Sequence, residues 1–84
     1  MSMHATEVER LQRRIRKAMN DGLPLMAIDI IGRLCDQKAG NGNHYRHQPQ
    51  VGGLISVMKR MPDVKYTERG GTYRIEKGEG DEEE

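Results

Sequence analysis

The sequence contains no Phe and no Trp, so a hydrophobic core has to be built from Leu, Ile, Val, Met and the three Tyr residues. Its 84 residues are 35% hydrophobic, which supports one small domain of marginal stability. No apolar run approaches the roughly 20 residues that a membrane-spanning helix needs. A charged N-terminal segment followed by an apolar one is also absent, so we expect no signal peptide and no membrane partner.

The single cysteine, Cys35, has no second cysteine with which to form an internal disulfide. This composition is typical of a reducing compartment, and the cytoplasm is the simplest setting. Together with His44 and His47, Cys35 gives an incomplete ligand set for zinc, so we expect no metal and no other cofactor. The sequence also lacks a Ser-His-Asp layout, a phosphate-binding Gly loop and a pair of active-site carboxylates. It therefore predicts a protein that is not an enzyme.

The net charge of +1 conceals an uneven distribution along the chain. The last six residues, 79–84, hold five of the thirteen acidic residues, so we expect 78–84 to form a disordered acidic tail. Residues 1–78 hold fourteen Lys and Arg against eight Asp and Glu, a net charge of +6. A basic body suits a polyanionic partner, but a solubilising surface explains the charge equally well.

Hydrophobic spacing predicts three helices, over about residues 6–20, 26–37 and 49–61. Gly22 supplies the stop of the first helix, and Pro62 that of the third. Cys35 falls on the predicted inner side of the second helix, where we expect a buried structural thiol. Residues 38–48 are rich in Gly and Asn and predict a long loop, and residues 1–5 predict a flexible N-terminus.

The segment 64–76 alternates apolar and polar residues on both sides of Gly70-Gly71. This pattern predicts a β-hairpin with the two glycines in a two-residue turn, where Gly supplies the required positive φ. In that register Tyr66 faces Ile75.

The predicted pairing gives the hairpin one apolar and one polar face, since directly opposed residues share a face. The apolar face holds Val64, Tyr66, Tyr73 and Ile75. The polar face holds Lys65, Thr67, Arg69, Thr72 and Arg74, with Arg69 directly opposite Thr72. An isolated hairpin is marginal in water, so we expect the three helices to pack against the apolar face.

The order of helix, short extended piece, helix, loop, helix and hairpin resembles the winged helix-turn-helix family of DNA-binding domains. The resemblance covers about residues 6–76 and is most specific in VGGLISVMKRMPDVKYTERGGTYRI, where a helix runs through MPDV into a Gly-tipped wing. It implies an α+β fold, a three-helix winged helix with a C-terminal β-hairpin wing, over residues 6–77. It also implies a third strand near residues 23–25. The loop 38–48 is longer than the tight turn often found in the family.

The resemblance implies that the third helix enters the major groove of double-stranded DNA and that the wing lies on the backbone or in the minor groove. Gln can pair with an adenine edge and Arg with a guanine edge. The candidate DNA-binding residues on and before the third helix are Arg46, Gln48, Gln50, Gly53, Ser56, Lys59 and Arg60, with Val57 flanking them. The candidates on the wing are Lys65, Thr67, Arg69, Thr72 and Arg74.

Each feature has an alternative interpretation. The polar side of the third helix is also explained as a solvated face, and the charged wing as protection of an exposed strand edge. Gly52 and Gly53 permit close approach to DNA or to the first helix, or they mark a late helix start. The basic back of the first helix is a solvated face, a phosphate contact or a dimer contact; its residues are Arg10, Arg13, Arg14 and Lys17.

The sequence therefore predicts a small DNA-binding transcriptional regulator that acts by occupying its site. A homodimer is expected, because symmetric half-sites multiply the contacts of a small module. The alternative is a winged helix used as a protein–protein interaction module, which an exposed apolar patch around Val57 would favour. A third interpretation has the acidic tail compete with DNA for the basic face.

Overall fold

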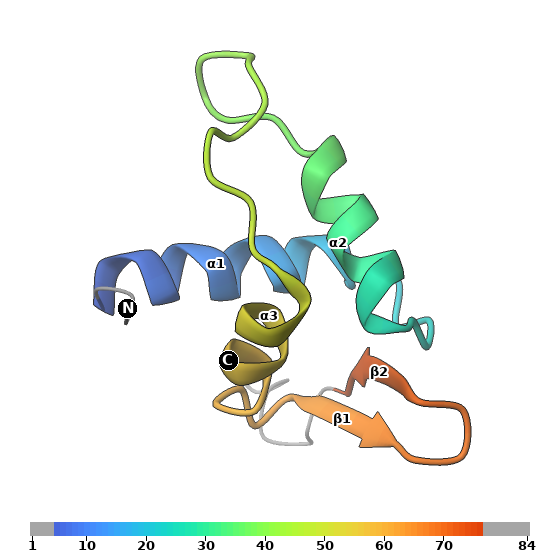
Figure 1. The fold of residues 1–84 in the computed structure, drawn as a ribbon. Coiled ribbons are helices and arrows are strands. Elements are labelled where there is room, and N and C mark those ends of the chain that lie inside the picture. The colour runs from blue at the N-terminus through green and yellow to red at the C-terminus, as the bar shows by residue number, and fades with distance from the viewer. Residues whose placement is uncertain (1–4, 77–84) are drawn as a thin grey trace, which may run out of the picture.

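The computed structural model describes residues 5–76 of the chain. In this range the helices and strands, in chain order, are α1 (Ala5–Ala18), α2 (Ala27–Asp36), α3 (Val51–Met58), β1 (Val64–Thr67) and β2 (Thr72–Ile75). Three helices thus precede a two-stranded antiparallel hairpin, with the long connection between α2 and α3 on the far side of α1 from the hairpin (Figure 1). The expected α+β class is confirmed, and the layout is consistent with a three-helix winged helix with a C-terminal wing.

Each helix is shorter than the hydrophobic spacing predicts, although the first turn of α1 begins one residue earlier than expected. That turn includes Ala5, which was expected in a flexible start; the rest of that segment, like the acidic tail 78–84, lies outside the described residues. Gly22 follows α1 with a φ of 73° and donates its amide to the Met19 carbonyl at 3.1 Å. Gln50 is the N-cap of α3 in an extended conformation, so Pro49 stays outside the helix.

The core lies where the three helices meet and contains only aliphatic and Met side chains, as the lack of Phe and Trp requires. Its buried members are Leu11, Ile15, Met19, Ile30, Leu34, Leu54, Val57, Met58 and Met61. Val64, Tyr73 and Ile75 pack on this core from the hairpin, as predicted for its apolar face. Val57 was expected to flank the exposed side of α3, but it is only 4% exposed, because its spacing from Leu54 and Met61 puts all three on one stripe.

The register of the hairpin differs from the prediction by two residues. Tyr66 pairs with Tyr73, not with Ile75, and the strands are joined by the four residues 68–71, not by a two-residue turn. Gly71 holds the positive φ of 64° in this loop and donates its amide to Glu68 at 3.2 Å. Because side-chain direction in a strand repeats every two residues, this slip leaves the strand residues on the faces predicted for them.

A third extended piece joins the sheet through a single residue, Leu25. Its amide donates to the Tyr73 carbonyl at 2.9 Å, and the Tyr73 amide donates to the Leu25 carbonyl at 2.7 Å. The expected third strand is therefore present as one bridge. It makes β2 the central strand and leaves β1 as the outer one, which explains why Tyr66 on β1 is 54% exposed although its ring lies 4.8 Å from that of Tyr73.

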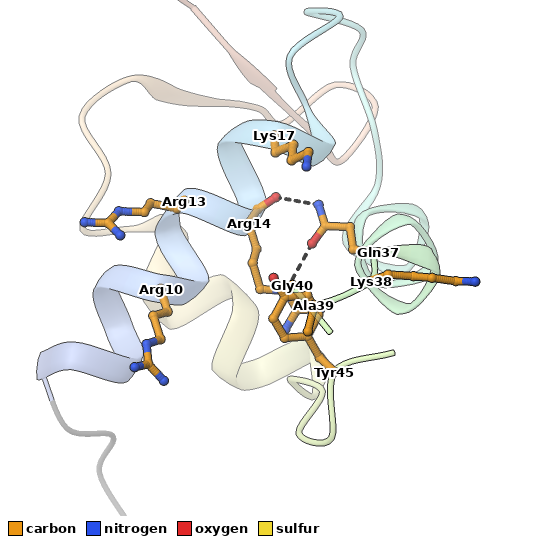
Figure 2. Close-up of a pocket in the computed structure, with 9 residues that line it drawn as sticks. All are labelled: Arg10, Arg13, Arg14, Lys17, Gln37, Lys38, Ala39, Gly40 and Tyr45. Carbon is orange, nitrogen blue, oxygen red and sulfur yellow. Dashed lines mark hydrogen bonds between the residues drawn. The ribbon is translucent and has the colours of Figure 1, made fainter. Parts of the chain in front are cut away.

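Arg14 is the one charged side chain buried among the described residues, at 9% exposed. Its Nε donates to Gln37 Oε1 at 3.0 Å, and its Nη2 donates to the Leu34 carbonyl at 2.8 Å and to Gln48 Oε1 at 2.9 Å. The Gln37 side chain returns a hydrogen bond to the Arg14 carbonyl at 2.9 Å (Figure 2). The Arg14 guanidinium also lies 3.8 Å from the ring centroid of Tyr45.

These contacts connect α1, the end of α2 and the long loop before α3. Burial lowers the pKa of Arg14, but its guanidinium stays protonated at neutral pH, since the free value is far above 7. The sequence-based view of Arg14 as part of a basic helix back is therefore wrong for this residue. At the polar edge of the core, Arg14 connects α1 to α2 and to the loop before α3 through its hydrogen bonds.

The loop after α2 contains a small hairpin of its own. Lys38 and His44 form an antiparallel bridge, and the Ala39 amide donates to the Asn43 carbonyl at 2.7 Å. Gly42 supplies a φ of 87° at the tip. With Tyr45 against Arg14, this hairpin gives the long connection a defined path.

An ion pair fixes the start of the wing to α1. Arg16 Nε and Nη2 donate to the two carboxylate oxygens of Asp63 at 2.8 and 3.2 Å. This hydrogen bonding lowers the pKa of Asp63 and raises that of Arg16. The Asp63 carbonyl also accepts the Glu76 amide at 2.7 Å, so Asp63 ties both ends of the hairpin to the helical part.

Replacing the buried guanidinium should cost more than replacing an exposed one on the same helix. We expect Arg14→Met to lower the free energy of unfolding by about 2–4 kcal/mol, because it leaves the Leu34 carbonyl and two glutamine side chains without their donor. Arg10→Met removes the same charge from an exposed site and should change stability by less than about 0.5 kcal/mol. Urea denaturation measures both; equal effects would contradict the structural role of Arg14.

The Arg16–Asp63 pair should make stability depend on acid pH. Since the pKa of Asp63 is lowered in the folded state, its contribution is present above the unfolded value of about 4 and is lost as the pH falls through the folded value. Asp63→Asn should lower stability by up to about 1 kcal/mol at pH 7, because Arg16 is half exposed, and the difference from wild type should vanish at acid pH. Asp36→Asn, at an exposed aspartate, is the control and should leave thermal unfolding at pH 7 nearly unchanged.

Candidate nucleic-acid interface

The exposed side of α3 is made of small residues followed by two cations. Ser56 lies opposite Leu54 and Met58, as the helical spacing predicts, whereas Gly53 lies about a quarter turn from Leu54; both are exposed to solvent. Lys59 and Arg60, also exposed, follow at the C-terminal end of α3. Figure 1 shows α3 end-on between α1 and the hairpin, and the chain continues from the end of α3 into β1.

Gly52 and Gly53 have no packing reason to be glycine within the described residues. A Cβ atom built at either position meets no atom within 4 Å, and neither residue has a positive φ. Close approach to α1 is therefore excluded as their explanation, and so is a late helix start, because both lie inside α3. Two glycines weaken an eight-residue helix by about 1 kcal/mol each relative to Ala, and they leave its backbone bare on the outer side.

The two glutamines before α3 have different environments. Both ends of the Gln48 amide are engaged inside the molecule, since Oε1 accepts from Arg14 at 2.9 Å and Nε2 donates to the Tyr45 carbonyl at 3.1 Å. Gln50 is exposed, and so is Arg46 in the preceding loop. Gln50 and Arg46 are thus the accessible candidates of this segment.

The polar face of the wing is built from two cross-strand pairs. Lys65 lies opposite Arg74, and Thr67 lies opposite Thr72. Arg74 donates from Nη1 and Nη2 to Glu76 Oε2 at 3.2 and 3.0 Å, an exposed ion pair that neutralises part of this face.

The tip of the wing differs from the prediction in one respect. Arg69 lies in the four-residue loop and does not face Thr72, because that residue pairs with Thr67. Arg69 is exposed there beside Glu68, so the tip carries one charge of each sign.

The long loop and α3 form a continuous stretch without carboxylates. Residues 37–62 contain no Asp and no Glu, and their charged side chains are Lys38, Arg46, Lys59 and Arg60. Lys59 and Arg60 are the charged side chains at the end of α3, whereas Lys38 belongs to the segment after α2, which faces α1. The carboxylates nearest in sequence, Asp36 and Asp63, flank it, and Asp63 is paired with Arg16.

Sequence reasoning missed the role of Arg14 and of its partners Gln37, Gln48 and Tyr45. One signal was present, since Arg14 lies three residues after Leu11 and directly before Ile15, at the edge of the buried stripe of α1. The partners come from residues 23 to 34 positions away. Periodicity gives no information on such long-range contacts.

Cys35 is exposed, so the expectation of a buried thiol is wrong. The buried side of α2 runs through Ile30 and Leu34, and Cys35 is rotated about a quarter turn beyond Leu34. Among residues 5–76, no group of three or more His, Cys, Asp or Glu side chains is placed to hold a metal ion. Within the same range, each helix is too short or too polar to cross a membrane.

Comparisons of the chain with protein-family models, with curated proteins and with solved structures give no match.

The stability of the wing should depend more on Gly71 than on its neighbour Gly70. Gly71→Ala should destabilise the hairpin by about 1–2 kcal/mol, because Ala is strained at a φ of 64°. Gly70→Ala is the matched control, since its Cβ would meet only the Thr72 side chain, at 3.8 Å. Amide exchange of β1 and β2 in the two variants measures the difference. Equal protection in both would contradict the turn geometry.

Proposed function

We propose that this protein binds double-stranded DNA through the outer side of α3 and through the wing, and regulates transcription by occupying its site. The observation that supports this most directly is the bare outer side of α3. Gly52 and Gly53 destabilise the helix, and no neighbouring atom within the described chain requires a glycine at either position. A helix surface of Gly and Ser followed by Lys59 and Arg60 suits close approach to a phosphate-lined groove.

In this proposal α3 enters the major groove, and Gln50, Ser56 and Arg60 face bases or phosphates. The absence of carboxylates from residues 50–62 supports this orientation, because an acidic side chain near the phosphates would repel them. Lys65 and Arg74 on the polar face of the wing, with Arg69 at its tip, then contact the backbone or the minor groove.

Gln48 takes an indirect role in this proposal. Its side chain bonds Arg14 and the Tyr45 carbonyl, two residues before the N-cap of α3. It therefore positions the start of α3 and does not itself reach a base. The setting we propose is the cytoplasm of a cell without a nucleus, where the chain has access to DNA and its lone thiol stays reduced.

A module with one short helix in the groove gains specificity when it binds as a pair on symmetric half-sites. We therefore include a homodimer in the proposal. Exposed apolar side chains at the α1–α2 connection suit such a contact, namely Leu23 (52% exposed), Met26 (49%) and Ile28 (62%).

The same three side chains support a second candidate function, a protein–protein interaction module that does not bind DNA. The patch expected around Val57 is ruled out as a docking surface, because Val57 is buried in the core. A partner would instead use the connection between α1 and α2. Absence of duplex binding even at low salt would favour this function.

The proposed function is tested by fluorescence anisotropy of a labelled mixed-sequence duplex with the full chain, at about 50 and 200 mM salt. We expect affinity to fall steeply with salt. Arg60→Ala and Arg69→Ala should each weaken binding and reduce the slope of log K against log salt by about one, because each removes one phosphate contact. No binding at either salt concentration would refute the proposal.

Comparing alanine substitutions at Gly53 and Gly32 distinguishes an effect on DNA binding from an effect on stability. Gly53→Ala and Gly32→Ala should each stabilise the fold by up to about 1 kcal/mol, since both replace an exposed helical glycine with open space around it. Only Gly53→Ala should weaken duplex binding, by about tenfold, because only its methyl group intrudes between α3 and the groove. If Gly53→Ala binds as well as Gly32→Ala, α3 does not approach DNA closely.

A further inference from the structure

A basic hollow of about 370 Å³ lies between α1 and the segment after α2, outside the surface assigned to DNA. The side chains that line it come from two walls (Figure 2). The α1 wall carries Arg10, Arg13, Arg14 and Lys17, and the facing wall carries Gln37, Lys38, Ala39, Gly40 and Tyr45.

The lining is strongly positive. Five of the nine lining residues are Lys or Arg, and none is Asp or Glu. Arg14 is held in place by its three hydrogen bonds and by Tyr45, so the charge at the base of the hollow is fixed. Arg10, Arg13, Lys17 and Lys38 are exposed and have no hydrogen bond or ion pair within residues 5–76. Their charges are available to an anion.

The hollow lies on the other side of α1 from α3. Leu11 and Ile15 of α1 share the core with Leu54 of α3. With 3.6 residues per turn, Arg13 and Lys17 point away from that core. A duplex held by α3 and the wing therefore leaves the hollow free.

The cations on α1 form a row rather than a closed site. Arg10 and Lys17 are seven residues apart, which is about 10 Å along the helix. Neighbouring phosphates of one strand of a duplex are about 6–7 Å apart in space, so a row of this length spans about two to three of them. A single small anion would contact only part of this row. The hollow is open to solvent along the row, so an extended polyanion can lie in it.

We propose that this hollow is a second binding site for the phosphate backbone of a nucleic acid, separate from the α3–wing surface. Arg10, Arg13 and Lys17 contact successive phosphates along α1, and Lys38, whose side chain is directed away from α1 in Figure 2, turns toward the strand from the opposite wall by a change of rotamer. Because the two surfaces lie on opposite sides of α1, one protein molecule then connects two nucleic-acid segments. The second site goes beyond the proposed function and does not require it, whereas the connection of two segments rests on the proposed function.

The test is an NMR titration of the ¹⁵N-labelled full chain with a short mixed-sequence duplex, continued beyond one equivalent. We expect two groups of amide signals to shift. Signals of residues 51–60 and 65–74 report the α3–wing surface, and signals of residues 10–17 and 38–40 report the hollow.

The outcomes separate the two proposals. Shifts confined to the α3–wing group would overturn the second site and leave the proposed function standing. Shifts confined to residues 10–17 and 38–40 would support the hollow and overturn the proposed function. Inorganic pyrophosphate, titrated separately, is the small-anion comparison. If it saturates the hollow at concentrations at which the duplex does not, the site binds a free phosphate anion and the backbone proposal fails.

Two charge-matched variants complete the test. Arg13→Gln should weaken the hollow event by about five- to tenfold near 0.1 M salt and reduce its salt slope by about one, with the α3–wing event unchanged. Arg60→Gln should do the reverse. Equal effects of both variants on both events would mean that only overall charge matters, and the proposal of a separate site would be wrong.

Discussion

The fold depends on how one buried cation is accommodated. Arg14 is a charged side chain at the edge of an aliphatic core, and an unpaired guanidinium there would destabilise the folded state by several kcal/mol. Gln37, the Leu34 carbonyl, Gln48 and the ring of Tyr45 surround it, and each comes from a different point of the chain between α2 and α3. These contacts connect α1 to the end of α2, to the returning loop and to the segment just before α3.

The order of the elements and the faces of the hairpin could be predicted from local patterns. Val64, Tyr73 and Ile75 reach the core as the alternation indicates, and they do so although the register is shifted by two residues, because a shift of two preserves every face. The prediction of a two-residue turn was wrong. Gly70-Gly71 is compatible with a two-residue turn and equally with the second half of a four-residue loop. Only cross-strand packing, here Tyr66 on Tyr73, selects between them.

The parts that the sequence did not reveal depend on contacts between distant residues. Arg14 was grouped with its exposed neighbours on α1, because periodicity describes one helix at a time and does not show Gln37 or Gln48. Helical spacing predicts Cys35 on the inner side of the second helix, but Cys35 is exposed, because no other element covers that side of α2 within the described residues. Among the candidate site residues, Gln48 proved to be engaged internally, whereas Gln50, Ser56, Arg60 and Arg69 are accessible.

The two glycines of α3 also affect the motion of the chain. With only eight residues, two of them Gly and no side-chain cap at its start, α3 is held in helical form by the burial of Leu54, Val57 and Met58 rather than by its own propensity. Its backbone should open to solvent more often than those of α1 and α2, and its amide hydrogens should exchange sooner. If α3 contacts DNA as proposed, binding would also order its backbone, which would lower the affinity by the entropy lost and let α3 adapt to the surface it contacts.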